Sequence, residues 1–542
     1  MIGFVTNGGF IEANTADGLR KCLVEEFSNL YVFHLRGNAR TSGERRRKEK
    51  DNVFGQGTRT PIAVSILVKN PQSAEHGKIY FHDIGDYLTR DQKLETVSEL
   101  GSIAGISQKG GWQAIQPDAF GDWLNQRDPL FDTYISLGEK KNKNVATIFE
   151  SHSSGVKTNR DTWCYNYSLK TVEKNINQCI AFYNEHAQKD DLDKSSIIYD
   201  PNKIGWSGGL VEKALRGKKL TFEKKRFVSS LYRPFSKSWM YYDQDLNERQ
   251  YQMPRIFPDR DATNKVICLS LAGTKEFSVL LADTLPDLHL VGDAQCFPFY
   301  LFESNENQAE DLLSQGGETG YERKDAIKNE ALDHFQSAYP EATLTKEDIF
   351  YYTYGLLHSE EYRERYADNL IKQLPRIPRM KRYEDFAAFA QAGRDLAAMH
   401  LHYESVDLNT HAKLSGPLGL RVTTQGVKGG QDTDFYVTKM KFAKKGDKSR
   451  VIYNGKITIE NIPEEAYDYV VNGKPALEWI MERQAVTTDK KSGIVNDAND
   501  WAIETMGNPR YPLELFLRVI AVSLRTQEIV RNLPKLEVIV TL

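Results

Sequence analysis

The order of apolar segments at the start of the chain constrains the fold more than any other feature of the sequence. Residues 2–7 read as a buried strand, and no strand or glycine-rich loop precedes them. A helix that Asn14 or Thr15 can cap follows, with apolar residues recurring every four positions. Its apolar stripe comprises Leu19, Leu23, Val24 and Phe27. Because the chain starts inside a running strand–helix–strand unit, we expect the front of this α/β domain to lie outside the sequence.

Three further segments near the start have the composition of strands. Residues 31–35, 61–68 and 78–82 are rich in Val, Ile and aromatic residues and are separated by Gly, Asn and charged residues. This order of elements predicts an α/β sheet that ends in an antiparallel hairpin. The loop over residues 37–60 is longer than the roughly 12–15 residues of an ordinary connection, which predicts a functional or a disordered segment.

The length of the chain and its irregular stretches predict three segments. A chain of 542 residues is too long for one hydrophobic core, and about two to four domains are expected. The pattern becomes irregular around residues 85–121, where we place the first boundary, and residues 305–330 are rich in Glu, Gln, Asn, Ser and Gly, as linkers are. We therefore divide the chain into residues 1–90, 91–330 and 331–542.

The last segment has the periodicities of a mixed α+β domain. Apolar residues at helical spacing run from Lys346 until Pro375 ends the pattern, which predicts a helical hairpin or a kinked helix. Tyr354, His358 and Tyr362 are expected to pack this helix pair. The remaining expected elements are strands at residues 434–442 and 450–459, a helix opened by Pro475 and a closing helix from Pro512 to about Asn532.

Composition favours a globular protein of the cytoplasm. Apolar residues make up 40% of the chain and charged residues 27%, and no stretch approaches the roughly 20 apolar residues of a membrane helix. The N-terminus lacks the pattern of a secretory signal, and the five cysteines stand singly along the chain. We expect a reduced, cytoplasmic protein without structural zinc.

The distribution of charge is more informative than the net charge of −3. Between Arg36 and Arg59 there are eight Lys or Arg residues against three acids, and between Arg216 and Arg260 there are eleven against five. Both blocks are candidate phosphate-facing surfaces, because a protein that reads DNA needs only one basic face. The alternative is that each block is an ordinary solvated surface.

Motifs for catalysis or metal binding are not found in the sequence. An adenine methyltransferase needs a glycine-rich turn and a tetrapeptide of the Asn-Pro-Pro-Tyr kind, and the nearest fragments, residues 69–72 and 507–510, lack the second proline and the aromatic residue. His400 and His402 with Glu404 resemble a metal site only weakly, and surface histidines explain them better. The sequence therefore predicts no catalytic residue and no metal site in this chain.

Basic and aromatic residues alternate between Leu231 and Pro258. Arg, Gln and Asn side chains can read base edges, Lys and Arg hold phosphates, and Tyr or Trp can support a displaced base. This composition suits DNA recognition, although a solvated β-hairpin with aromatic core residues would have the same pattern.

Six stretches point together to one family. They are Gly18–Lys21, Leu35–Gly43, Leu231–Phe235, Gln252–Arg255, Tyr354–Ser359 and Val471–Trp479. The chain resembles the C-terminal part of Type ISP restriction-modification enzymes over essentially all of its length. Members of this family are single polypeptides with, in order, a nuclease, a helicase-like ATPase, a coupling region, an adenine methyltransferase core and a target recognition domain.

The resemblance implies a fold and a function for each segment. Residues 1–90 would be an α/β remnant of a Rossmann-like methyltransferase sheet, formed by its C-terminal strands. The rest would be a large mixed α+β DNA-recognition domain, with a first lobe at residues 91–330 and a C-terminal specificity lobe at residues 331–542. Such a chain would recognise a specific sequence in double-stranded DNA for an adenine-N6 methyltransferase and would be inactive by itself. S-adenosylmethionine, ATP and Mg²⁺ are implied for the full-length enzyme, and no cofactor is expected in this chain.

Candidate DNA-binding residues are chosen by the chemistry of their side chains. In the first basic block, phosphate contact is favoured for Arg36, Asn38, Arg40, Arg45, Arg46 and Arg47. In the second block, groove readout or phosphate positioning is favoured for Arg233, Lys237, Arg249, Gln250, Gln252 and Arg255. Arg160 is a weaker candidate, since a buried Arg–Asp pair would explain it equally well.

Two other functions stay open on the sequence. The chain could be a complementing subunit that docks on a separate methyltransferase half, in which case the sheet edge and the face around Phe4, Phe10 and Phe33 should be apolar and exposed. It could also be an intact enzyme of unrelated chemistry, if distant residues assemble a catalytic cluster.

Overall fold

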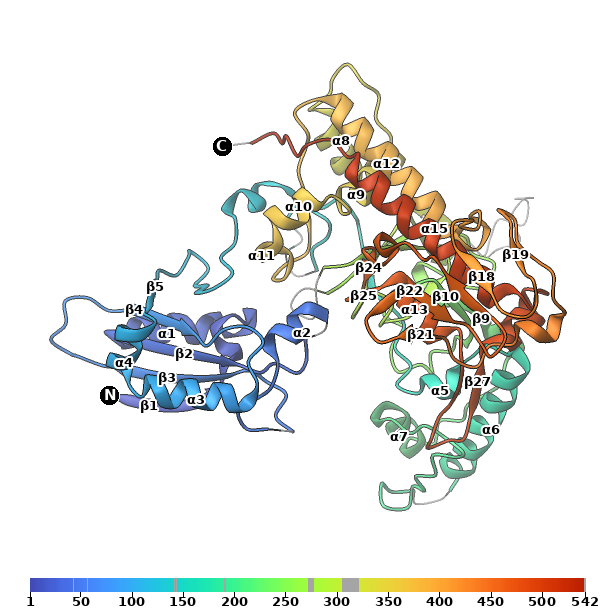
Figure 1. Cartoon of the computed structure of the whole chain (residues 1–542), viewed down its shortest axis with the longest axis horizontal. Helices are drawn as coiled ribbons and strands as arrows, with labels where there is room; N and C mark the ends of the chain where they lie inside the picture. Colours follow the sequence, from blue (N-terminus) through green and yellow to red (C-terminus); the bar gives the residue numbers. More distant parts are fainter. Residues whose placement is uncertain are drawn as a thin grey trace, which may run out of the picture. The chain divides into compact units, whose positions relative to one another are not determined.

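The structure is a computed structural model that divides into two compact units (Figure 1). It describes residues 1–41, 43–55, 57–140, 142, 144–189, 192–271, 277–304 and 321–540, and the side chains of residues 43–45 are outside this description. Unit 1 is formed by residues 1–133 together with residues 365–375. The described residues of unit 2 are 134–140, 142, 144–189, 192–271, 277–304, 321–364 and 376–540.

Unit 1 is built on a five-stranded sheet with the order β1-β3-β2-β4-β5. Its strands are β1 (Ile2–Asn7), β2 (Asn29–Arg36), β3 (Ile62–Val68), β4 (Lys78–Asp83) and β5 (Gln113–Ile115). β3 lies between β1 and β2 and is antiparallel to both, β4 is parallel to β2, and β5 is antiparallel to β4. β1, β2 and β4 therefore run in the same direction, with an antiparallel strand inserted between the first two.

Both faces of this sheet are covered, because β2 alternates its apolar side chains between two cores. Leu30 and Val32 pack in one core with Phe27, which follows helix α1 (Asp17–Glu26). Phe33 and Leu35 pack in the other core, against helices α3 (Arg90–Leu100) and α4 (Ile103–Lys109). A fourth helix, α2 (Gly43–Glu49), lies in the long loop between β2 and β3.

The start of the chain differs from the sequence-based expectation. β1 is an edge strand and all six of its residues are exposed, so the prediction of a buried strand was wrong. Leu19 is also exposed, whereas its neighbour Arg20 is fully buried in α1. Phe10 packs edge-on against Trp123 and Phe33 is buried, so Phe4 alone of the three named phenylalanines is exposed.

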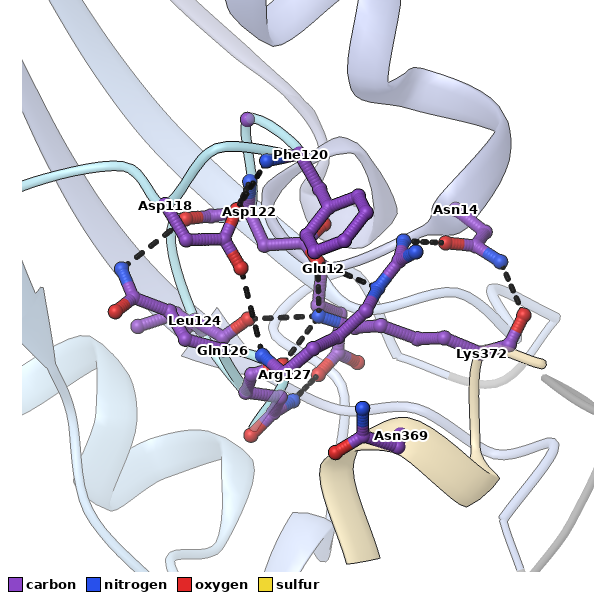
Figure 2. A network of polar contacts seen from close by, with 12 residues as sticks. Glu12, Asn14, Asp118, Phe120, Asp122, Leu124, Gln126, Arg127, Asn369 and Lys372 are labelled. Atoms are coloured by element: carbon purple, nitrogen blue, oxygen red, sulfur yellow. Dashed lines mark hydrogen bonds and ion pairs between the residues drawn. The ribbon is translucent and has the colours of Figure 1, made fainter. Parts of the chain in front are cut away.

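A buried ionic network joins residues 365–375 to the rest of unit 1 (Figure 2). The carboxylate of Asp122 is 2.9 Å from Arg20, 2.8 Å from Lys372 and 3.1 Å from Arg127. Lys372 also donates to the carbonyls of Leu124 and Asn125. A single carboxylate thus pairs with three cations contributed by separate parts of the chain, one of them on the returning segment that contains α11 (Ala367–Leu370).

Unit 2 is a mixed α/β structure with three four-stranded sheets. The first has the order β13 (Leu285–Pro286), β9 (Phe227–Arg233), β10 (Ser236–Tyr241) and β8 (Tyr165–Asn166). The second has the order β12 (Val279–Ala282), β11 (Val266–Leu269), β14 (Gln295–Pro298) and β7 (Ser153–Ser154). The third has the order β18 (Lys413–Ser415), β23 (Thr458–Glu460), β22 (Asp447–Ile452) and β21 (Lys441–Lys444).

Five strand pairs and a set of helices complete unit 2. The pairs are β15 (Tyr300–Ser304) with β16 (Tyr321–Asp325), β17 (Arg376–Ile377) with β6 (Ile135–Ser136), β19 (Arg421–Val422) with β20 (Val427–Lys428), β24 (Val470–Val471) with β25 (Lys474–Pro475), and β26 (Val486–Thr488) with β27 (Val495–Asp497). The helices are α5 (Asp161–Cys164), α6 (Leu169–Ala187), α7 (Gly208–Leu215), α8 (Asn329–Gln336), α9 (Lys346–Leu356), α10 (Glu360–Arg365), α12 (Tyr383–Leu401), α13 (Ala476–Arg483), α14 (Ala498–Asp500) and α15 (Tyr511–Arg531).

The backbones of helices α9 and α12 lie very close to each other at two glycines. A Cβ atom on Gly393 would lie 1.9 Å from the carbonyl oxygen of Tyr351, and one on Gly355 would lie 2.1 Å from that of Phe389. Only glycine permits this separation at both positions. Tyr354 of α9 and His400 of α12 share a 2.7 Å hydrogen bond, so Tyr354 packs against a helix outside the pair predicted over residues 346–375.

Several expected elements of unit 2 need correction. Residues 434–442 are mostly not a strand, since β21 begins at Lys441, and residues 450–459 are divided between β22 and β23. The helical pattern after residue 346 is broken into α9, α10 and α11. His400 is buried rather than on the surface. The closing helix and the helix after Pro475 are confirmed as α15 and α13.

Candidate nucleic-acid interface

Hydrogen bonds close the base of the long loop between β2 and β3. Asn52 donates from Nδ2 to the carbonyls of Gly37, at 3.2 Å, and Thr60, at 2.8 Å, which closes the base of the loop. Gly37 has φ of +92°, and a Cβ there would lie 2.9 Å from the Cα of Asn52. The fully buried Lys93 of α3 donates to the carbonyls of Glu49, at 2.9 Å, and Asp51, at 2.7 Å. Burial lowers the pKa of Lys93 to about 8.

This loop presents only some of its candidate residues to solvent. Arg36 is paired with Asp83, at 2.7 Å, and with Asp86, so its guanidinium is already neutralised. Burial disfavours the charged form of Asp83, but hydrogen bonds from His34 and Arg36 lower its pKa to about 2. Asn38 is half-buried and accepts from the Arg40 amide, and Arg46 is half-buried and donates to the Lys50 carbonyl. Arg40 and Arg47 are exposed. The side chain of Arg45 lies outside the described part of the chain.

In unit 2 three candidate cations are structural. Arg160 is buried and donates to the carbonyls of Gly205 and Leu246, and its acidic neighbour is Glu248 at 3.8 Å, not an aspartate. Arg233 lies over the ring of Tyr232 and binds Asp287 at 2.6 Å. Lys237 is largely buried and binds Glu404 at 2.7 Å.

The other candidates of unit 2 form an exposed strip over residues 249–252. The side chains of Arg249 and Gln252 are exposed, whereas Gln250 is half-buried and donates to Asn247 at 3.2 Å. Arg249 and Lys157 exchange two backbone hydrogen bonds of 2.9 Å, and the Gln252 amide donates to Ser153. Arg255 lies one turn further and is 3.5 Å from Glu303. The strip is therefore anchored along residues 153–157.

A polar cavity of about 290 Å³ lies next to this strip. The residues that line it are Val156, Lys157, Thr158, Asn159, Asp161, Asp287, Leu288 and His289. Asn159 at its rim and Tyr251 in the neighbouring strip both have positive φ, of 57° and 52°. Such backbone conformations in non-glycine residues cluster at ligand-binding sites.

Two carboxylates that line this cavity, Asp161 and Asp287, each accept a hydrogen bond from a tyrosine hydroxyl. Asp287 accepts from Arg233, from the hydroxyl of Tyr165 at 3.1 Å and from the amide of His289 at 2.8 Å. Asp161 accepts from the hydroxyl of Tyr232 at 3.1 Å. Burial raises the pKa of Asp287 to about 6, although the positive charge of Arg233 lowers it. Both carboxylates accept hydrogen bonds in the structure.

The cavity and the strip together combine the donors and acceptors that base recognition uses. Carboxylates accept from the amino group of cytosine, amides bind adenine, and Arg or Lys donate to guanine or to phosphates. The sequence missed Lys157, Asn159, Asp161, Asp287 and His289. Asn159 and Asp161 flank Arg160, so the signal was present, but the residue between them was chosen for its charge.

Membrane-spanning helices and metal sites are both absent from the described residues. No helix among them is both long and apolar enough to cross a membrane. No group of three or more His, Cys, Asp or Glu side chains in the part of the chain that the structure describes could hold a metal ion.

Comparison with known proteins identifies the family. A model of the Type ISP C-terminal specificity domain matches residues 147–515, which is more than half of the chain. The chain belongs to the Type ISP family. The resemblance seen in the sequence is thus confirmed. No curated protein matches the chain.

Three solved structures are similar over nearly the whole chain. The ATP-dependent Type ISP restriction-modification enzyme LlaBIII bound to DNA is 36% identical, with a TM-score of 0.85, and the match covers 99% of this chain and 33% of that one. A nuclease-deletion mutant of the Type ISP enzyme LlaGI with a DNA substrate mimic is 38% identical, with a TM-score of 0.84, and coverage is 99% and 46%. The DrdV–DNA complex is 32% identical, with a TM-score of 0.80, and coverage is 98% and 50%. This Type ISP chain thus spans between a third and a half of these relatives.

Proposed function

We propose that this chain is the part of a Type ISP restriction-modification enzyme that recognises a specific sequence in double-stranded DNA. The observation that carries the proposal is the family match over residues 147–515, supported by likeness to two Type ISP enzymes that were solved with DNA. The polar cavity beside residues 249–252 supports it further, because the partly or fully exposed residues Lys157, Asn159 and Asp161 line it, while Asp287 is buried and paired with Arg233.

We assign some candidate residues to DNA contact and others to support of the protein structure. We assign base or phosphate contact in unit 2 to Lys157, Arg249, Gln250 and Gln252, with Arg255 at the edge. Arg160, Arg233 and Lys237 are buried or neutralised by acids, so their proposed role is to hold the cavity and its surroundings in shape. In unit 1, Arg40 and Arg47 are the exposed candidates for phosphate contact, and Arg36, Asn38 and Arg46 support the loop that carries them.

We further propose that residues 1–90 are the closing strands of an adenine-N6 methyltransferase sheet, and that residues 91–330 and 331–542 are two lobes of the target recognition domain. Strands β1, β2 and β4, which run in the same direction, support this division. The stretches Gly18–Lys21 and Leu35–Gly43, on which the family resemblance partly rests, also lie in unit 1. Unit 1 is longer than the first of these segments, because it also includes residues 91–133 and 365–375.

Cofactor chemistry would reside in parts of the relatives that this chain does not span. LlaBIII is ATP-dependent, and an adenine methyltransferase needs S-adenosylmethionine. The residues present do not fit these groups: the sequence has no glycine-rich phosphate or nucleoside loop, and the described carboxylates and histidines do not gather into a metal site. No catalytic step is therefore assigned to this chain.

Binding of duplex DNA by the whole chain tests the proposal. Fluorescence anisotropy with a labelled duplex should show binding whose affinity falls steeply as salt rises, because phosphate contacts release counterions. Methyl transfer and S-adenosylmethionine binding should be undetectable in the same preparation. Absent binding, or binding that does not depend on salt, would contradict the proposal.

A second function, docking on a separate methyltransferase half, is favoured by one observation. β1 is an unpaired edge of the sheet, and Ile2, Phe4 and Val5 are exposed on it. Such an edge can accept another strand. Co-purification with a polypeptide that carries the missing methyltransferase motifs would support this function, and a monomeric chain that binds DNA alone would favour the first.

A further inference from the structure

The hairpin formed by β21 and β22 is the most basic exposed element that the proposed function has not used. Residues 439–450 contain six Lys or Arg residues and one acid. Nearly all positions from Lys441 to Arg450 are exposed or half-exposed. The cations are Lys439, Lys441, Lys444, Lys445, Lys448 and Arg450.

The tip of this hairpin is a two-stranded ribbon with an irregular ladder between Phe442 and Lys444, and its base continues into the four-stranded sheet through the pairing of β22 with β23. Phe442 pairs with Val451 across the ladder, and Phe442 packs against the ring of Tyr467, which fixes the base of the ribbon. Lys444 pairs with Asp447, which leaves Lys445 and Gly446 as a two-residue turn. Gly446 has φ of +86°, the conformation that the third position of a type II turn requires.

Part of the charge of the ribbon is paired with acids and part of it is not. Lys448, next to Asp447 at the tip, binds Glu478 at 3.1 Å, and Arg450 binds Glu460 at 2.9 Å. Asp447 is hydrogen-bonded to the amide and hydroxyl of Ser449, and Lys444 interacts with it electrostatically. Within the described residues, Lys441, Lys444 and Lys445 form no ion pair closer than 4.0 Å.

We propose that the β21–β22 ribbon binds the phosphate backbone of duplex DNA and so supplies affinity that does not depend on sequence. A two-stranded ribbon fits the major groove, and lysines carry charge to phosphates without reading bases. The inference rests on the proposed function, since it assumes that the chain binds DNA. It adds a phosphate-contacting element that is distant in sequence from the two basic blocks.

The competing explanation is protection of a sheet edge. β21 is the last strand in its sheet, and exposed edges often carry lysine to prevent pairing with other chains. The two explanations predict different losses when the charge is removed. A phosphate contact would weaken DNA binding, whereas edge protection would leave DNA binding intact and increase self-association.

The test is the triple variant Lys441→Gln, Lys444→Gln, Lys445→Gln in the whole chain. Its binding to a mixed-sequence duplex of thirty base pairs is measured by anisotropy across a salt series. If each lysine contacts one phosphate, the slope of log affinity against log salt should flatten by about 0.9 per contact, and affinity near 0.1 M salt should fall by roughly one to two orders of magnitude.

Two matched variants separate this effect from others. The variant Lys170→Gln, Lys174→Gln, Lys189→Gln removes the same charge from exposed positions on and just after α6, and should bind DNA as the wild type does. Replacing Lys441, Lys444 and Lys445 by arginine keeps the charge and should preserve affinity and slope. This second variant also shows that the ribbon tolerates substitution.

The outcomes are distinct. A ribbon variant whose affinity and slope equal those of the wild type overturns the inference, and equal DNA binding with increased self-association favours edge protection instead. An equal loss in the α6 variant would mean that net charge alone matters, which also overturns it. A wild-type chain that binds no duplex at all would remove the proposed function, and the inference with it.

Discussion

Replacing Asp122 by asparagine should destabilise unit 1 more than any single change at its surface. The carboxylate is 1% exposed and contacts Arg20, Lys372 and Arg127, of which the first two are 0% and 3% exposed. Asparagine keeps the shape but removes the negative charge that Arg127 and Lys372 share (Figure 2) and that Arg20 also contacts. Removing one partner of a buried pair costs about 3–5 kcal/mol, because the other charge stays buried without compensation.

The remaining hydrogen bonds place the expected cost near the lower end of that range. Arg20 keeps the carbonyls of Gly121, Phe10 and Ala13, and Lys372 keeps two carbonyls of its own. A loss of about 3 kcal/mol corresponds to a melting temperature lowered by roughly 6–12 °C for a unit of this size. By contrast, Lys372→Met leaves the carboxylate with two arginines and should cost about 1–3 kcal/mol, the penalty for buried carbonyls that lose a donor.

Hydrogen exchange read by mass spectrometry suits this test, because two units need not unfold together. In Asp122→Asn, peptides from residues 1–133 and 365–375 should exchange faster, while peptides from α9 and α12 should not change. Glu26→Gln, which removes a half-exposed partner of Lys69, is the control and should behave as the wild type does. An Asp122→Asn chain with wild-type melting and exchange would show that the network does not stabilise the unit.

Three further changes test other parts of the structure. Lys93→Met should leave the Glu49 and Asp51 carbonyls without their donor, and limited proteolysis should then cut the loop of residues 37–60 faster than in the wild type; unchanged protection would refute the role given to Lys93. The pKa of Asp83 is lowered from 3.8 to about 2 in the folded state, so its stabilising contribution is complete above pH about 4 and is lost as the pH falls toward 2. The variant Asp83→Asn should therefore lose less stability than the wild type as the pH falls through this range. Gly393→Ala must separate α9 from α12 and should cost at least about 1–3 kcal/mol in thermal unfolding, while Gly208→Ala, whose Cβ would meet nothing within 4 Å, should not.

Elements whose signal is local could be predicted from the sequence. The closing helix α15 has a proline in its first turn and a long apolar pattern, and it was predicted to within a residue at each end. The strands β2, β3 and β4 were likewise found from β-branched and aromatic runs. The family resemblance depends on such short local motifs as well.

Features that depend on distant partners could not be predicted. Arg20 rather than Leu19 is buried in α1 because its acceptors, Gly121 and Asp122, lie about a hundred residues further along the chain. Arg233 was chosen as a DNA contact from its neighbours, but its partner Asp287 is 54 residues away. A count of basic residues identifies charge, whereas the fold decides which charges are already neutralised.

The lysines of the β21–β22 ribbon were missed for a different reason. Residues 439–450 are at least as basic as either block named from the sequence, but they contain a single aromatic residue, Phe442, whereas basic and aromatic residues alternate over residues 231–258. The structure places these lysines on a hairpin. Three of them, Lys441, Lys444 and Lys445, form no ion pair closer than 4.0 Å with the described residues.

Selection from a pool of random duplexes measures the central claim most directly. The whole chain is incubated with the pool, bound duplexes are recovered and sequenced, and the cycle is repeated at rising salt to suppress phosphate-only binding. The account predicts enrichment of one short sequence, and a relaxed preference at one or two positions of it when Arg249 and Gln252 are replaced by alanine. Recovery of bound DNA with no enriched sequence would contradict the claim that this chain recognises a specific site.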